Sequence, residues 1–118
     1  MAPAGDLAMP LPDFSRLVQL HLQGLLGHRN YLTASTYQQL HFGQPAYAYG
    51  WAVSHLAATG APLSYHDGSA GTFFCSAFLY PSLQVAIVVM ANAGDPPAEK
   101  ACATLRIRLR KLYVQGAL

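Results

Sequence analysis

The fold is decided by the stretch HDGSAGTFFCSAFLYPSLQVAIVVMAN, residues 66–92. Its polar opening, His66 to Gly71, stands directly before the most apolar segment of the chain. Two apolar runs follow, residues 73–80 and 83–91, and Pro81-Ser82 separates them, which predicts an antiparallel hairpin. Because both runs are nearly continuously apolar, we expect the hairpin to be covered on both faces.

Helices are predicted on either side of this hairpin in the sequence. Residues 11–26 carry an apolar stripe at helical spacing, with prolines in the first turn and Gly27 as a stop signal. Residues 34–40 form a short predicted helix, capped by Thr33 or Ser35. The last predicted helix spans residues 98–113. We expect its inner stripe to be Ala98, Ala101, Cys102, Leu105, Leu109 and Leu112.

Two further runs are predicted to be strands. Residues 47–53 are aromatic and alternating, and residues 63–66 form a short strand that enters a turn at His66-Asp67-Gly68. The sequence therefore predicts an α+β fold, in which an antiparallel sheet of three to four strands is packed by a C-terminal helix and N-terminal helices. We expect residues 1–10 to be a flexible N-terminus and residues 11–118 to form a single domain.

The composition is unusual for a domain of this size. Hydrophobic residues make up 53% of the 118 residues and charged residues only 10%, against about 25% charged residues in ordinary domains. Such a chain buries a core but has few charges for the remaining surface. We therefore expect surface that belongs against a partner, as in a fragment, a subunit or part of a larger protein.

The formal net charge of +2 is too small to indicate nucleic-acid binding. Five of the seven basic residues nevertheless fall within or beside the last predicted helix, where we interpret them as a solvated face, with a polyanion or lipid-headgroup patch as the alternative. They are Lys100, Arg106, Arg108, Arg110 and Lys111.

Cysteine and histidine spacing indicates no metal site. Cys75 and Cys102 form no CxxC motif and are interpreted as free thiols, with a disulfide between them left open. The remaining histidines, His21, His28, His41 and His55, lack ligand spacing, and we expect no metal and no cofactor. No apolar run of membrane-spanning length and no signal peptide is found in this sequence, and localisation stays open.

Several motifs resemble the C-terminal part of serine beta-lactamase-like hydrolases, closest to the class C beta-lactamase and penicillin-binding esterase branch. The resemblance covers residues 5–113. It rests on His66-Asp67-Gly68, which matches the His-x-Gly version of the family's Lys-Thr-Gly triplet, and on segments before and after it. These are Tyr49-Gly50-Trp51, Ser69-Ala70-Gly71-Thr72-Phe73, Tyr80-Pro81 and Val88-Val89-Met90-Ala91-Asn92.

The resemblance implies a remnant of a hydrolase site. His66 would support the catalytic network, and the backbone N–H of Ser69 would be one of two oxyanion donors. Gly68 would let substrate approach the strand. From their residue type, six aromatic residues are expected in the core, with a substrate-binding place for Trp51 in the cleft as the alternative: Tyr47, Tyr49, Trp51, Phe73, Phe74 and Phe78. Asp67 is given no role. A Ser69–His66–Asp67 triad is excluded, since neighbouring residues on a strand point to opposite faces.

The family's nucleophilic motifs are absent from this sequence. Serine is never followed three residues later by lysine, and no tyrosine or serine has an asparagine two residues on. We therefore expect a truncated hydrolase fragment of the ester, amide or lactam class that is inactive alone. The alternative is a non-catalytic interaction module that associates with itself or with a separate N-terminal half. A third hypothesis, a new hydrolase site at Ser69 or Cys75, is left open.

Overall fold

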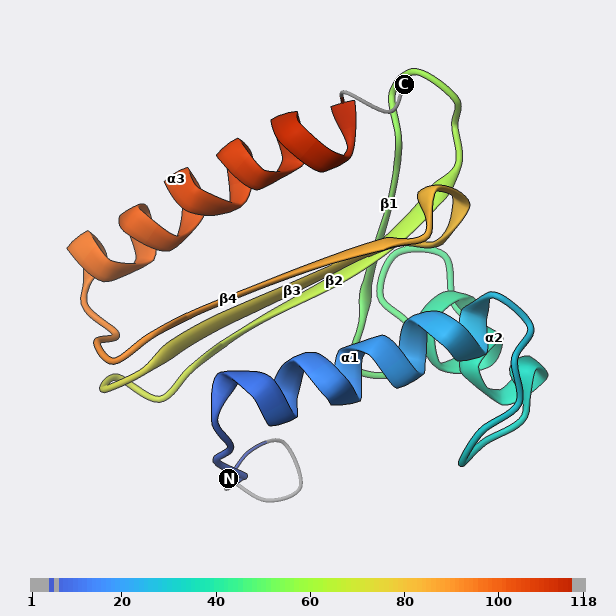
Figure 1. Cartoon of the computed structure of the whole chain (residues 1–118), viewed down its shortest axis with the longest axis horizontal. Helices are drawn as coiled ribbons and strands as arrows, with labels where there is room; N and C mark the ends of the chain where they lie inside the picture. The colour runs from blue at the N-terminus through green and yellow to red at the C-terminus, as the bar shows by residue number, and fades with distance from the viewer. Residues whose placement is uncertain (1–4, 6, 116–118) are drawn as a thin grey trace.

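The sheet lies between helices on its two faces, as Figure 1 shows for this computed structural model. The structure describes residue 5 and residues 7–115. Its elements are α1 (Leu11–Leu25), α2 (Ala34–Phe42), β1 (Ala52–His55), β2 (Pro62–Ser69), β3 (Phe74–Tyr80), the 3-10 helix η1 (Pro81–Leu83), β4 (Val85–Ala91) and α3 (Pro96–Tyr113). All strand pairs are antiparallel, in the order β1-β2-β3-β4. The predicted α+β class, with its C-terminal and N-terminal helices, is confirmed.

The chain ends are only partly described. Of the predicted flexible N-terminus, residues 1–4 and 6 lie outside the described residues, and residues 7–10 precede α1 without helix or strand. Residues 116–118, at the end of the predicted domain, also lie outside the described residues.

The predicted hairpin is confirmed, with β3 and β4 paired from Phe74↔Ala91 to Tyr80↔Val85. The turn between them is η1 followed by Gln84, which has a φ of 56°. Helix α1 covers one face of the hairpin and α3 the other (Figure 1). This arrangement explains why both strands are apolar on both faces.

Both strands predicted for the first half of the sheet are present as β1 and β2, but their predicted bounds were wrong. The run 47–53 is mostly a turn: Gly50 has a φ of 85°, the Ala48 amide donates to the Trp51 carbonyl at 2.8 Å, and only Tyr47 bridges to Ala52. The strand predicted at 63–66 instead continues to Ser69, because His66 to Ser69 all pair with β3. His66-Asp67-Gly68 is therefore part of a strand, and the turn comes after it.

The inner stripe of α3 also differs from the prediction. Cys102 is buried and Leu109 packs against the core, whereas Leu105 and Leu112 are exposed. Arg106 occupies the inner face instead, with its guanidinium carbon 4.4 Å from the ring centroid of Phe78. A cation–π contact and the apolar stem of arginine make this position favourable for a basic residue. Ala101 is exposed as well.

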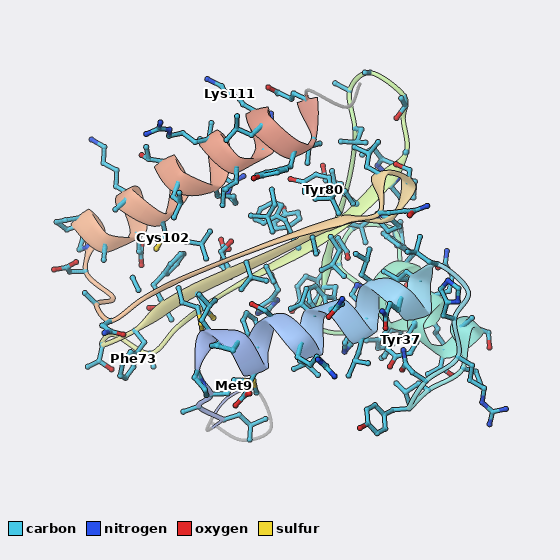
Figure 2. All side chains as sticks on the ribbon, in the orientation of Figure 1. Met9, Tyr37, Phe73, Tyr80, Cys102 and Lys111 are labelled. Atoms are coloured by element: carbon cyan, nitrogen blue, oxygen red, sulfur yellow. The ribbon has the colours of Figure 1, made fainter. Side chains whose placement is uncertain are left out.

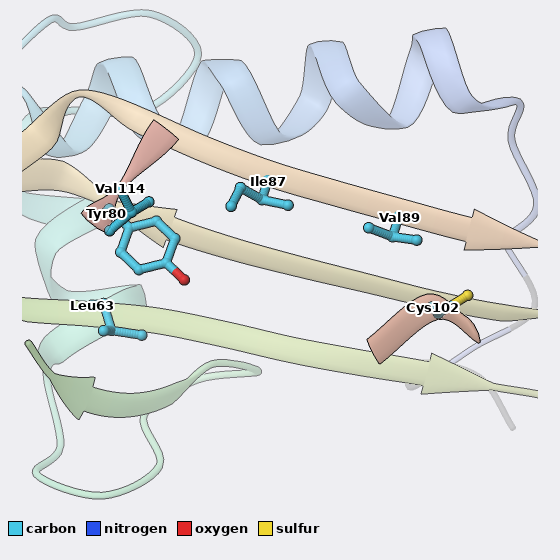
Figure 3. Close-up of a cluster of buried hydrophobic side chains, with 6 residues drawn as sticks. All are labelled: Leu63, Tyr80, Ile87, Val89, Cys102 and Val114. Atoms are coloured by element: carbon cyan, nitrogen blue, oxygen red, sulfur yellow. The ribbon is translucent and has the colours of Figure 1, made fainter. Parts of the chain in front are cut away.

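The core has two parts, one on each face of the sheet. Figure 3 shows the part under α3, where Tyr80 lies among aliphatic side chains of β2 and β4, and Figure 2 shows Tyr80 between the sheet and α3. The buried members are Leu63, Tyr80, Ile87, Val89, Cys102 and Val114. The part under α1 contains Val18, Leu22, Ala77 and Leu79. Three aromatic residues expected in the core, Tyr47, Tyr49 and Phe73, are instead exposed.

Asp95 caps α3, and its removal gives a first test of the fold. Its Oδ1 accepts a hydrogen bond from the Ala98 amide at 3.0 Å, and two prolines follow in the first turn. We expect Asp95→Ala to lower the free energy of unfolding by about 1 kcal/mol, because an amide loses its partner. Urea unfolding measures this change. Asp95→Asn, which keeps a capping oxygen, should lose less than half as much, and equal losses would contradict this role.

Candidate functional site

Residues His66 to Ser69 form the second half of β2, beyond the last residue of β1 that pairs with it. β1 pairs with β2 only between His55↔Pro62 and Ala52↔Tyr65. The residues before β1 do not extend this pairing, because the chain turns at Gly50. β3 pairs with β2 along its length, as far as Ser69↔Phe74. Among the described residues, this half of β2 thus has a strand neighbour on one side only.

The alternation of hydrogen-bonded and non-bonded pairs along the strands shows which backbone groups face the open side. The Leu56 amide donates to the Ala61 carbonyl at 2.8 Å, and the Ala70 amide donates to the Phe73 carbonyl at 3.4 Å. In antiparallel strands, bonded pairs alternate with non-bonded pairs. Both bonds therefore assign the odd-numbered residues of β2 to the β1 side. The N–H and C=O groups of Asp67 and Ser69 therefore point to the same side, where no residue of β1 pairs with them.

The turn after β2 is held in place by local contacts. Gly71 has a φ of 85°, and the Ser69 hydroxyl accepts a hydrogen bond from the Gly71 amide at 3.4 Å. A Cβ at Gly94 would lie 2.8 Å from the carbonyl carbon of Gly71, so the loop after β4 packs directly against this turn. The hydroxyl of Ser69 thus belongs to the turn, and its amide is the group that faces the open side.

His66 and Asp67 point to opposite faces of the sheet, as predicted. Asp67 lines a small hollow on the α3 face with Cys102 and Arg106. The Nδ1 of His66 lies 3.4 Å from the hydroxyl of Tyr47. Both side chains are exposed. Both residues belong to the open half of β2, but their side chains lie on opposite faces of the sheet, which agrees with the exclusion of a local triad.

Gly68 lies against Cys75, its partner on β3. A Cβ at position 68 would be 2.9 Å from the Cys75 Sγ, which is too close for an unperturbed contact. Burial raises the pKa of the Cys75 thiol, which makes it a weaker nucleophile at neutral pH. Cys75 and Cys102 are free thiols, and burial raises the pKa of Cys102 too.

We expect Gly68→Ala to lower the free energy of unfolding by about 1–2 kcal/mol, because the added methyl group overpacks against the Cys75 sulfur. The double variant Gly68→Ala/Cys75→Ala should recover most of this loss relative to Cys75→Ala alone. Urea denaturation of the four proteins gives the coupling. Additive losses would show that the contact with sulfur is not the cause.

Trp51 lies in a second polar cluster that was not predicted from the sequence. Its ring stacks on His41, with centroids 4.3 Å apart, and it packs against the α1 side of the core. The Nδ1 of His41 lies 2.7 Å from the Ser64 hydroxyl, and the Nε2 of His41 lies 2.9 Å from the Nδ1 of His21. These contacts form the His21–His41–Ser64 chain of side chains, which joins α1, α2 and β2. The substrate-binding role of Trp51 stays a prediction.

The chemistry of this cluster is limited by its burial. A Ser-His pair at 2.7 Å resembles the nucleophile and base of a hydrolase, but His41 and Ser64 are both 0% exposed. A substrate cannot reach a hydroxyl that is closed off on all sides, so the cluster holds the helices on the sheet. Residues 21, 41 and 64 are distant in sequence, and no local spacing signal could have revealed them.

Burial also sets the protonation of the two histidines. It lowers the pKa of His41 to about 3, with a smaller contribution from the neighbouring His21, and burial lowers the pKa of His21. Both imidazoles are therefore neutral at pH 7, where each has one donor and one acceptor nitrogen. Within the described ranges, no group of three or more potential metal ligands occurs, and no helix has the length and apolarity needed to span a membrane.

Comparison with family models, with curated proteins and with solved structures finds no match to this chain.

Proposed function

We propose that this chain supplies the substrate-side strand of a serine beta-lactamase-like hydrolase, the class that the motif His66-Asp67-Gly68 resembles. The observation that carries the proposal is the open side of β2 from Asp67 to Ser69. An acyl substrate would lie along this side, with its carbonyl oxygen accepting a hydrogen bond from the Ser69 amide. The parent reaction class is hydrolysis of an ester, amide or lactam through an acyl-serine.

Three features of the site support this assignment. The Ser69 amide lies at a strand end, next to a turn held by Gly71 and Gly94, so it is a positioned donor. Gly68 has no side chain to obstruct a substrate at the strand. His66 is exposed beside the same segment and is within reach of Tyr47, so its imidazole is available to the substrate's carboxylate or ester oxygen.

The chain lacks the groups that carry out acyl transfer in this class. Its sequence contains no Ser-x-x-Lys and no Tyr-x-Asn or Ser-x-Asn, so it has neither the nucleophile with its lysine nor the asparagine of that motif. One oxyanion donor out of two is also insufficient, since loss of one donor typically lowers the rate by about 100- to 1000-fold. Catalysis would require a second polypeptide segment that brings these groups to β2.

Turnover assays on the purified chain test the catalytic part of the proposal. We expect no hydrolysis of a chromogenic cephalosporin or a p-nitrophenyl ester above the buffer rate. Activity that co-purifies with the chain through successive columns would contradict this expectation. Labelling with a fluorophosphonate or with iodoacetamide would then identify the nucleophile. Labelled Ser69 or Cys75 would indicate a new hydrolase site and not the remnant of a beta-lactamase-like site.

A second candidate function is a non-catalytic interaction module that associates with itself or with a separate N-terminal half. The observation that favours it is the exposure of large apolar side chains on α3 in a chain with only 10% charged residues. Leu112 is 69% exposed and Leu105 is 48% exposed. Light scattering distinguishes this candidate, since a monomer at all concentrations would contradict association with itself.

A further inference from the structure

The two edges of the sheet differ in how they are protected. β1 is an edge of four residues, it is bridged by Tyr47, and it lies beside a turn. These are features by which proteins prevent edge pairing. β4 is an edge of seven residues, Val-Ala-Ile-Val-Val-Met-Ala, with no charge, no proline and no bulge, and within residues 7–115 it pairs only with β3. The β4 edge is therefore the unprotected one.

The outward backbone groups of β4 follow from the same alternation of hydrogen bonds. The residues of β3 that face β2 are Cys75, Ala77 and Leu79, which leaves the even-numbered residues of β3 to bond with β4. Their partners are the odd-numbered residues of β4. The N–H and C=O groups of Ala86, Val88 and Met90 therefore point outward, away from β3.

The surroundings of this edge are suited to an added strand. On the α1 side, an open groove of about 490 Å³ runs between α1 and β4, with Ala86 and Val88 in its wall. On the α3 side, Ala103 and Arg106 lie toward Asp67 of β2. Leu105 and Leu112 fall on the opposite flank of the helix, which is the flank toward β4. An added strand would cover Ala86 and Val88 on the α1 face, where Ser15, Arg16 and Gln19 also line the groove, and it would lie beside Leu105 and Leu112 on the α3 face.

We propose that β4 is the interface through which a second copy of this chain adds to the sheet, with the two β4 strands antiparallel and centred on Val88. This register is self-complementary. Val88 faces its own copy, Ala86 faces Met90, and each outward group meets another outward group, which gives about six backbone hydrogen bonds across the two-fold axis. The two four-stranded sheets become continuous.

A second copy fits this edge because every pair in that register joins apolar residues, and because β4 itself is uncharged, so that no like-charged side chains of the two β4 strands face each other. The proposal specifies the surface for the second candidate function, association with itself, and is independent of the hydrolase proposal.

Amide hydrogen exchange combined with sedimentation tests the interface. We expect a concentration-dependent dimer in which the amides of Ala86, Val88 and Met90 become protected on association, while those of Ile87 and Val89 are protected in both states. A dimer in which the three outward amides still exchange fast would overturn the β4 interface but keep association with itself. A protein that stays monomeric at all concentrations would overturn both.

Ala86→Pro is the matched variant, because it removes an outward N–H without removing a bond to β3. Each dimer would lose two hydrogen bonds, and we expect the dissociation constant to rise by at least about tenfold. Ala86→Ser keeps the N–H and should dimerise like the parent. If Ala86→Pro does not fold, Met90→Lys places a charge at the same edge, with Tyr31→Lys in the exposed loop as its control. Unchanged dissociation constants in the folded edge variant would contradict the proposal.

Discussion

Acidification from pH 7 to pH 4 is expected to destabilise this protein steeply, through His41. Because its pKa is lowered to about 3 from 6.5, the unfolded chain binds a proton at a pH where the folded chain does not. The stability that neutral His41 provides is therefore fully present above pH 6.5 and is lost as the pH falls toward 3. The expected loss is about 1.4 kcal/mol per pH unit below pH 6, with an upper limit of about 5 kcal/mol.

Urea unfolding at pH 7, 6, 5 and 4.5 measures this dependence. His21 has its pKa lowered by burial as well, so it adds to the slope in the same direction. His41→Asn removes the titration but keeps a polar atom near the Ser64 hydroxyl, and its pH dependence should be flatter. His55→Asn, at an exposed histidine, should retain the slope of the parent. A parent protein equally stable at pH 7 and pH 5 would exclude a neutral buried His41.

Gly24→Ala is expected to destabilise the protein by about 3 kcal/mol, although alanine is ordinarily better than glycine in a helix by about 1 kcal/mol. A Cβ at position 24 would lie 2.0 Å from Cδ2 of Tyr37, a buried ring of α2. Tyr37 cannot move freely, because its hydroxyl donates to Asn30 Oδ1 and its ring contacts His21 edge-on at 5.1 Å. Overpacking of this kind therefore outweighs the helix propensity.

The control for this substitution is Gln23→Ala, at the adjacent exposed position of α1. It should change stability by less than about 0.5 kcal/mol. Thermal or urea unfolding of both variants provides the comparison. A Gly24→Ala protein as stable as the parent would show that α1 and α2 are not packed at this point as described.

The periodic elements of the fold could be predicted from the sequence, and the aperiodic contacts could not. Helix α1 and the β3–β4 hairpin follow from long apolar patterns with clear stop signals. The pattern misled at residues 47–53, where a positive φ at Gly50 produces a turn inside an alternating run. The apolar pattern also misled on α3. It assigns only apolar residues to the inner face of the helix and leaves Arg106 on the solvent side, although the guanidinium of Arg106 lies over the ring of Phe78.

The candidate site shows the same division. The sequence identified the segment His66 to Ser69 from its motif, but it placed the segment in a turn, since polar residues and a glycine are typical of turns. Only the pairing with β3 shows that this segment is a strand with one open side. The His21–His41–Ser64 chain was missed, because its members are brought together by the packing of three elements that no local pattern connects.

The most direct test of the central claim is a titration of the labelled protein with a cephalosporin, followed through backbone amide chemical shifts. We expect saturable shifts centred on Asp67 and Ser69, with dissociation constants in the millimolar range. Ser69→Pro, which removes the outward N–H, should abolish them, and Ser69→Ala, which keeps it, should retain them. Shifts that are absent, or that survive Ser69→Pro in a folded protein, would contradict the assignment of this strand edge as the substrate side of a hydrolase.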